Sequence, residues 1–186
     1  DSAADPDEVP ENVEALSAMG FDSWIEDQFT RPPGYLEPYT AWAMANGNAI
    51  QLYGNYKEHA WWSRAMGAVH MQPDVAATQI PDLLRQRVAF ALSQILVVSD
   101  RPETLGVAQQ GMANFYDLMV KHAFGNYRTL LEAVATSPIM GIYLSHLRNQ
   151  KADPVTGRVP DENFAREVMQ LFSIGLTEIN LDGMPK

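Results

Sequence analysis

Apolar positions recur with the period of an α-helix along most of this chain. Residues 103–124 are predicted to form one amphipathic helix, and residues 127–135 a second one. Residues 81–99 are also predicted to be helical, but from Val88 to Val98 the apolar side chains cover nearly every direction. A helix with that pattern belongs in the middle of a core. No segment shows the two-residue alternation of a β-strand, so the pattern predicts an all-α fold.

Glycine, proline and capping residues delimit further helices. Residues 11–19 are predicted to be helical and to stop at Gly20, and Ser23 and Glu26 have the spacing of a capping box that opens a helix through Phe29. Residues 38–66 are predicted to form two helices with an irregular join.

Two N-caps are predicted in the second half of the chain. Asn126 precedes the helix of residues 127–135, and Ser137 followed by Pro138 opens a helix that ends near Leu147. We therefore expect an irregular bundle of eight or nine helices around a central apolar helix. Residues 1–10 are expected to be an acidic, flexible lead-in and residues 11–186 a single helical domain.

The stretch from Pro160 to Gly175 has the most distinctive pattern. On a helix its apolar side chains share one side, and the polar side chains fill a wedge about 140° wide. The wedge allows two pairs at the i,i+4 spacing, and its members are Glu162, Asn163, Arg166, Glu167 and Gln170. These polar residues line a ligand-binding cleft, or form a buried structural network, or lie on an ordinary solvated face. The spacing does not decide between these interpretations.

Two arginines and a histidine are the expected neighbours of this polar wedge. Arg85 and Arg87 precede the apolar stretch, and a buried arginine needs a partner because an unpaired internal charge is costly. We expect Arg85 or Arg87 to pair with a carboxylate of residues 162–167. His122 is predicted to bond a neighbouring helix end. The candidate polar cluster is therefore Glu162, Asn163, Arg166, Glu167, Arg87 and His122.

Charge is concentrated at the N-terminus of the chain. Residues 1–40 hold ten acidic residues against Arg31, whereas the remaining residues are close to neutral. No Lys/Arg stripe is present, which argues against nucleic acid as a partner. The longest apolar stretch is too short to span a bilayer, and the chain has no cysteine. We therefore expect no transmembrane segment, no disulfide and no thiolate chemistry.

Familiar catalytic and metal-binding signatures are missing from the sequence. The four histidines lack the local spacing of a helical metal site, so no metal site is predicted and any cofactor is unknown. Residues 153–161 and 180–183 offer oxygen ligands for calcium, but turn formation is the simpler interpretation. An aromatic cluster offers either sugar stacking or, preferably, core packing; its members are Tyr39, Trp42, Tyr53, Tyr56, Trp61 and Trp62.

Four sequence blocks, in their order, resemble a known family. They are residues 14–29, 85–95, 122–134 and the block Glu162-Asn163-Phe164-Ala165-Arg166-Glu167, which is the most specific. Together they resemble the bacterial DUF1800 family, whose function is unknown, over residues 11–186. Members are usually longer and commonly exported, so the resemblance implies export to the periplasm or cell surface. It also implies that these residues are the N-terminal part of a longer domain.

The resemblance and the residues leave three functions open, and one of them is a binding module that works with a partner exported protein. The first is an exported, non-catalytic component of a cell-surface or envelope assembly, whose expected partners are a second exported protein of the DUF1501 type or copies of itself. The alternative is an exported enzyme, such as a hydrolase acting on polysaccharide, with a polar site on residues 161–175. Glu162 and Glu167 are its acid/base candidates, but they diverge by about 140° on a helix, so they do not readily flank one bond.

Overall fold

The computed structural model describes residues 17–46, 55–65 and 82–186 of the chain. Within these ranges it contains nine α-helices, one π-helix and no strand beyond two isolated bridges, so the predicted all-α class is confirmed. The acidic lead-in, most of the helix predicted over residues 11–19, and Tyr53 lie outside the described residues.

The first three helices follow the predicted segments with one change at a helix start. They are α2 (Phe21–Thr30), α3 (Glu37–Asn46) and α4 (Tyr56–Ala65). Gly20 has a φ of 83°, which is the left-handed conformation that glycine often adopts where a helix ends. The same residue occupies the N-cap position of α2. The predicted capping box is therefore wrong, because Ser23 lies inside α2 rather than before it.

The predicted helix of residues 103–124 is divided in two. It consists of α6 (Glu103–Gly106) and α7 (Gln109–His122), which follow α5 (Leu83–Ile95). Ala108 leaves the helical region with φ −90° and ψ 46°. A Cβ atom on Gly106 would lie 2.9 Å from the carbonyl oxygen of Asp100, so the chain passes too close there for a side chain.

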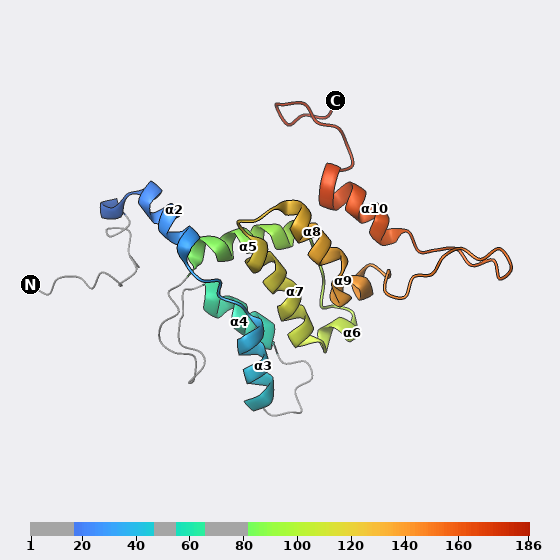
Figure 1. The fold of residues 1–186 in the computed structure, drawn as a ribbon, viewed down its shortest axis with the longest axis horizontal. Helices are drawn as coiled ribbons and strands as arrows, with labels where there is room; N and C mark the ends of the chain where they lie inside the picture. Colours follow the sequence, from blue (N-terminus) through green and yellow to red (C-terminus); the bar gives the residue numbers. More distant parts are fainter. Residues whose placement is uncertain (1–16, 47–54, 66–81) are drawn as a thin grey trace, which may run out of the picture.

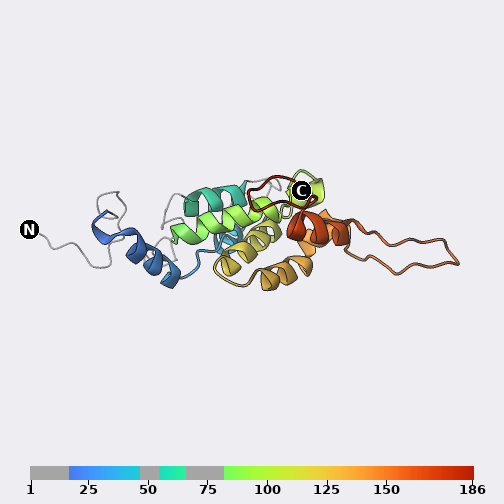
Figure 2. The same ribbon diagram turned by 90° about the horizontal axis from the view of Figure 1, so that it is seen from above.

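The central helix of the fold is α7, not the apolar helix that the sequence placed there. Seen from above, α4 and α5 lie on one side of α7 and α8 lies on the other (Figure 2). The buried residues of α5 include Arg85 and Gln86, whereas Phe90 and Ile95 are 41% and 47% exposed. The apolar residues of α5 therefore lie partly in the core and partly on an exposed face, so the helix is not buried on every side. The core buries side chains from both halves of α7, namely Met112, Ala113, Phe115, Met119 and Val120.

The next two helices test the two predicted N-caps. In α8 (Tyr127–Ala135) the side chain of Asn126 accepts hydrogen bonds from the backbone N–H groups of Arg128 (2.9 Å) and Thr129 (3.4 Å). In α9 (Pro138–Tyr143) Ser137 occupies the N-cap position, but its side chain makes no capping bond. α9 also ends earlier than predicted.

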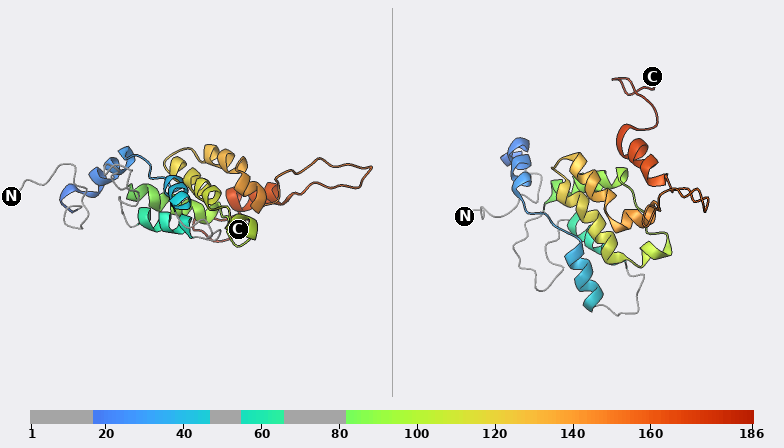
Figure 3. Two further views of the ribbon diagram at one scale, coloured as in Figure 1. Left: turned by 90° about the horizontal axis from the view of Figure 1, so that it is seen from below. Right: turned by 45° about the vertical axis from the view of Figure 1, so that its right-hand side comes forward.

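The last helices lie at the edge of the molecule. α10 (Asn163–Met169) continues into the π-helix η1 (Gln170–Ile174), which stops at Gly175, with a φ of 78°. The segment of residues 149–161 before α10 projects from the body as a long loop that folds back on itself (Figures 1 and 3). Residues 175–186 extend on another side of the body. In both segments the acidic side chains bond their own turn, as Asp153 does with the Val155 N–H and the Thr156 hydroxyl.

We predict that Asn126→Ala lowers the free energy of unfolding by about 1 kcal/mol, because two backbone N–H groups of α8 lose their acceptor. Chemical denaturation followed by circular dichroism measures the change. Ser137→Ala is the matched control, and it should cost clearly less because Ser137 makes no capping bond. Equal losses in the two variants would contradict the assignment of the caps.

Candidate functional site

The helix with the most distinctive sequence is attached to the body by its apolar side. The ring of Phe164 stacks on His146, with centroids 3.9 Å apart, and Phe172 is buried. The Tyr127 hydroxyl donates a 2.6 Å hydrogen bond to the carbonyl oxygen of Phe172. These contacts fix α10 and η1 beside α8 and α9.

The polar side of this helix is only partly in solvent, because Glu162 and Arg166 are exposed whereas Asn163, Glu167 and Gln170 are half-buried. The predicted pair of Glu162 and Arg166 is present, at 3.6 Å, but the two side chains are 83% and 51% exposed. An exposed pair of this kind contributes less than about 1 kcal/mol. Within the described residues, the second predicted pair, between Asn163 and Glu167, forms no hydrogen bond.

The structure does not bring the other two members of the predicted cluster to α10. Arg87 is exposed on α5, and His122 is partly exposed at the C-terminal end of α7. Burial and the neighbouring Lys121 lower the pKa of His122. The expected pairing of Arg85 or Arg87 with a carboxylate of residues 162–167 is wrong. Positions 85 and 87 lie on nearly opposite sides of a helix, since two residues correspond to a rotation of about 200°. Arg85 is the buried one, so Arg87 faces solvent.

The buried polar groups lie instead around the connector of residues 31–36, between α2 and α3. The carboxylate of Asp82, just before α5, accepts a 2.8 Å hydrogen bond from the Gly34 N–H. The side-chain amide of Gln86 donates to the Gly34 carbonyl oxygen at 2.9 Å. This connector has no helix to satisfy its own backbone, so side chains of α5 supply the partners.

A second carboxylate holds the end of the same connector. Asp117, in the middle of α7, accepts hydrogen bonds from the N–H groups of Leu36 (2.7 Å) and Glu37 (2.9 Å), at the start of α3. Burial raises the pKa of Asp117 to about 6, although these two N–H groups oppose the shift. Burial likewise raises the pKa of Asp82 and lowers that of Arg64, which lies near both carboxylates.

Arg85 has its partners in this connector region. Its guanidinium lies 3.7 Å from the Asp82 carboxylate and donates to the carbonyl oxygens of Val120 (3.3 Å) and Arg31 (3.4 Å). Its Cζ atom also lies 4.5 Å from the centre of the Phe124 ring. The arginine of the predicted network is therefore buried and paired, but with the first half of the fold.

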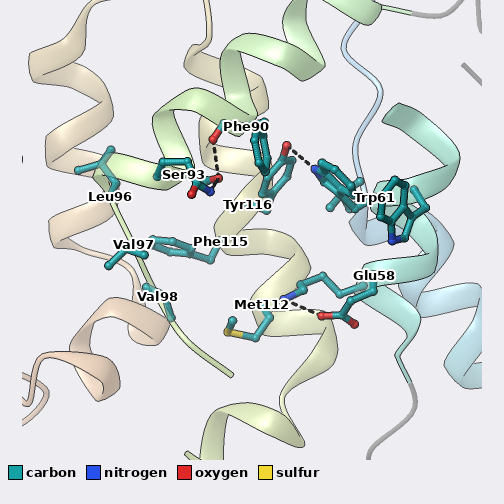
Figure 4. Close-up of a pocket in the computed structure, with 14 residues that line it drawn as sticks. Glu58, Trp61, Phe90, Ser93, Leu96, Val97, Val98, Met112, Phe115 and Tyr116 are labelled. Carbon is teal, nitrogen blue, oxygen red and sulfur yellow. Dashed lines mark hydrogen bonds and ion pairs between the residues drawn. The ribbon is translucent and has the colours of Figure 1, made fainter. Parts of the chain in front are cut away.

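A pocket of about 280 Å³ opens between α4, α5 and α7 (Figure 4). Two of its aromatic residues, Trp61 and Trp62, belong to the aromatic cluster noted in the sequence. The others come from α5 and α7, so five aromatic side chains line it, namely Trp61, Trp62, Phe90, Phe115 and Tyr116. A volume near the lower end of the usual range of roughly 300–1,000 Å³ suits a small ligand.

The pocket carries charge at one edge. Lys57 lies 2.9 Å from the Glu58 carboxylate and 3.6 Å from that of Asp100. Lys57 and Glu58 line the pocket together with Ser93 and Gln94, and no residue of α10 does. Within the described residues, no group of three histidine or acidic side chains is arranged to hold a metal ion.

The sequence contains a local signal for the burial of Asp117, although no motif includes this residue. Ala113, Asp117 and Val120 share the buried face of α7 at the i, i+4, i+7 spacing. An acidic residue on an apolar face needs hydrogen-bond donors from elsewhere. For Asp82 and the pocket no comparable signal exists, because their surroundings come from segments far apart in the chain.

Comparison with known families identifies the chain. Residues 8–181 match the family described as "Protein of unknown function (DUF1800)". This chain belongs to the DUF1800 family. Neither the curated proteins nor the solved structures gave a significant match. Membership confirms the resemblance noted in the sequence, and it assigns no reaction. None of the described helices of this DUF1800 protein is both long and apolar enough to cross a membrane.

We predict that Arg85→Met lowers the free energy of unfolding by about 3 kcal/mol, since it leaves the buried Asp82 carboxylate and two carbonyl oxygens without that partner. Arg87→Met is the matched control on the same helix, and it should change stability by less than about 0.5 kcal/mol. Thermal and urea denaturation of both variants measure the difference. If Arg87→Met were the more damaging change, this placement of the two arginines would be wrong.

We also predict that Asp117 makes stability depend on pH. Because the folded-state pKa is about 6 against an ordinary 3.8, the folded protein binds the proton more tightly than the unfolded chain. The contribution of this carboxyl to the free energy of unfolding is therefore fully present below about pH 4 and is lost as the pH rises through about 6.

Urea denaturation at several pH values between 4 and 7 tests this dependence. The stability of the unmodified protein relative to Asp117→Asn should fall over that range, and subtraction of the variant removes the contributions of other carboxyls. A difference that is constant or rises with pH would contradict the raised pKa.

Proposed function

We propose that this DUF1800 protein is an exported, non-catalytic component of a cell-surface or envelope assembly, and that residues 163–186 contact another polypeptide. The observation that carries the proposal is the apolar surface of this C-terminal arm. Ile174 and Leu176 are 83% and 72% exposed, and further large apolar side chains are exposed along the same arm, namely Met169, Leu171, Ile179, Leu181 and Met184.

The position of these side chains supports a protein partner. Single exposed apolar residues are common on protein surfaces, but a continuous series along one segment is typical of an interaction site. Residues 175–186 extend away from the helical body, and these side chains are uncovered within the part of the chain that the structure describes (Figure 1). Burial of one leucine or isoleucine side chain contributes about 1.5–3 kcal/mol, so a few such residues suffice for a stable contact.

Export and the identity of the partner rest on the family. The resemblance implies an exported protein that works beside a second exported protein of the DUF1501 type or with copies of itself. The enzyme alternative has less support from the geometry. Of its two acid/base candidates, Glu162 is largely in solvent and Glu167 is half-buried, and neither lines the pocket. A general acid or base usually needs a more enclosed site.

We predict that protein isolated from the periplasmic or cell-surface fraction of its source is a defined multimer or retains a second polypeptide. Leu176→Glu and Ile179→Glu should each weaken this association at least about tenfold, because a charge replaces a buried apolar side chain. Native mass spectrometry identifies the species, and analytical ultracentrifugation measures the affinity.

Phe21→Glu provides the matched control. Phe21 is 74% exposed and lies on α2, on the opposite side of the molecule from α10 (Figure 1). This variant should associate as the unmodified protein does. A monomer without a second polypeptide, or equal weakening by all three variants, would contradict the proposed role of the arm.

A further inference from the structure

The pocket between α4, α5 and α7 has aromatic walls that are fixed before any ligand binds. The indole N–H of Trp61 donates a 2.8 Å hydrogen bond to the Tyr116 hydroxyl. The ring of Trp62 lies nearly perpendicular to that of Trp61, with centroids 4.8 Å apart, and Phe90 packs on Trp61 at 5.3 Å. Figure 4 shows Phe90, Tyr116 and Trp61 side by side on one wall.

The interior of the pocket and its opening differ in solvent exposure. Leu96, Met112 and Phe115 line it and are themselves buried, at 0%, 4% and 6% exposure. Trp62 and Phe90 are in contrast 59% and 41% exposed. A ligand with an apolar ring would therefore find an apolar interior and would cover two rings that solvent now reaches.

The charges at the edge select the polar end of such a ligand. Lys57 pairs with Glu58 and with Asp100, and of these two carboxylates only that of Glu58 lines the pocket. The second carboxylate oxygen of Glu58 is buried and has no hydrogen-bond partner, so it is placed to accept from a cation. The faces of aromatic rings are also negative, and they attract organic cations within about 6 Å. An anionic ligand would meet the Glu58 carboxylate, whereas the Lys57 ammonium group already pairs with Glu58 and Asp100.

The polar side chains of the wall are poorly placed for a sugar. The Ser93 hydroxyl donates to the Phe90 carbonyl oxygen at 2.7 Å, and the Gln94 amide lies 3.5 Å from that hydroxyl. The Trp61 N–H is occupied by Tyr116. Several hydroxyl groups of a sugar would thus compete with bonds already made, and each unpaired group costs free energy.

We propose that this pocket binds a small organic ammonium ion that carries one flat apolar ring. The ring lies against Trp61, Phe90 and Met112, and the ammonium group lies beside the Glu58 carboxylate. This binding site is separate from the C-terminal arm, and it does not depend on the proposed assembly role.

Three probes of similar size test the charge preference. Phenethylammonium, 2-phenylethanol and phenylacetate share a phenyl ring and differ in charge. Titrations followed by ¹H–¹⁵N NMR report on the four indole N–H groups of the chain. We expect the signals of Trp61 and Trp62 to shift while those of Trp24 and Trp42, which do not line the pocket, stay in place. Phenethylammonium should bind about fivefold more tightly than 2-phenylethanol, and phenylacetate should bind least.

Two variants locate the interaction. Glu58→Gln should weaken phenethylammonium about threefold and leave 2-phenylethanol unchanged, because it removes one charge at the edge of the pocket. Trp62→Ala should weaken both probes. The controls Glu132→Gln, on the exposed part of α8, and Trp42→Ala, outside the pocket, should bind both probes as the unmodified protein does.

Three outcomes would overturn the proposal. The first is equal affinity for the three probes, and the second is no shift of Trp61 or Trp62 at millimolar concentrations. The third is an unchanged affinity for phenethylammonium in Glu58→Gln, with the remaining indole signals in place to show that the variant is folded.

Discussion

Two buried carboxylates, of Asp82 and Asp117, hold the connector of residues 31–36 against α5 and α7. The connector is non-helical and largely enclosed, so its backbone groups need partners that it cannot supply itself. Gln86 and Arg85 complete the arrangement by donating to the carbonyl oxygens of Gly34 and Arg31. Because burial raises the pKa of both carboxyls and so disfavours their charged forms, the packing of α2 and α3 on the body depends on these hydrogen bonds.

The same interaction shapes the pocket. The backbone N–H of Leu36 donates a hydrogen bond to Asp117, and Leu36 also lines the pocket. Tyr116, next to Asp117 on α7, fixes the Trp61 ring of α4. Burial raises the pKa of Tyr116 to about 12, so its hydroxyl keeps its proton at physiological pH. The pocket walls are therefore positioned by the buried network rather than by the helix of residues 163–169.

The two surfaces proposed for interaction have different physical characters. The pocket lies where α5 and α7 pack against each other, and its rings contact one another. The C-terminal arm is attached mainly through Phe164 and Phe172 and leaves its remaining apolar side chains exposed. A rigid pocket suits a small ligand, whereas an extended apolar arm suits another polypeptide. A non-catalytic member of the DUF1800 family would use both surfaces without a reaction.

Local patterns in the sequence were enough for the all-α class, most helix segments, the Asn126 cap and the family. Each depends on residues close in the chain, where spacing and capping chemistry act directly. These local patterns did not determine that the Ser137 side chain makes no capping hydrogen bond or that α7 rather than α5 is central. They also did not determine that Arg85 pairs with Asp82. Nor did they predict the pocket, whose walls come from α4, α5 and α7. These features were decided by tertiary packing, because burial and hydrogen-bond partners depend on which distant segments meet, and a helical period does not contain that information.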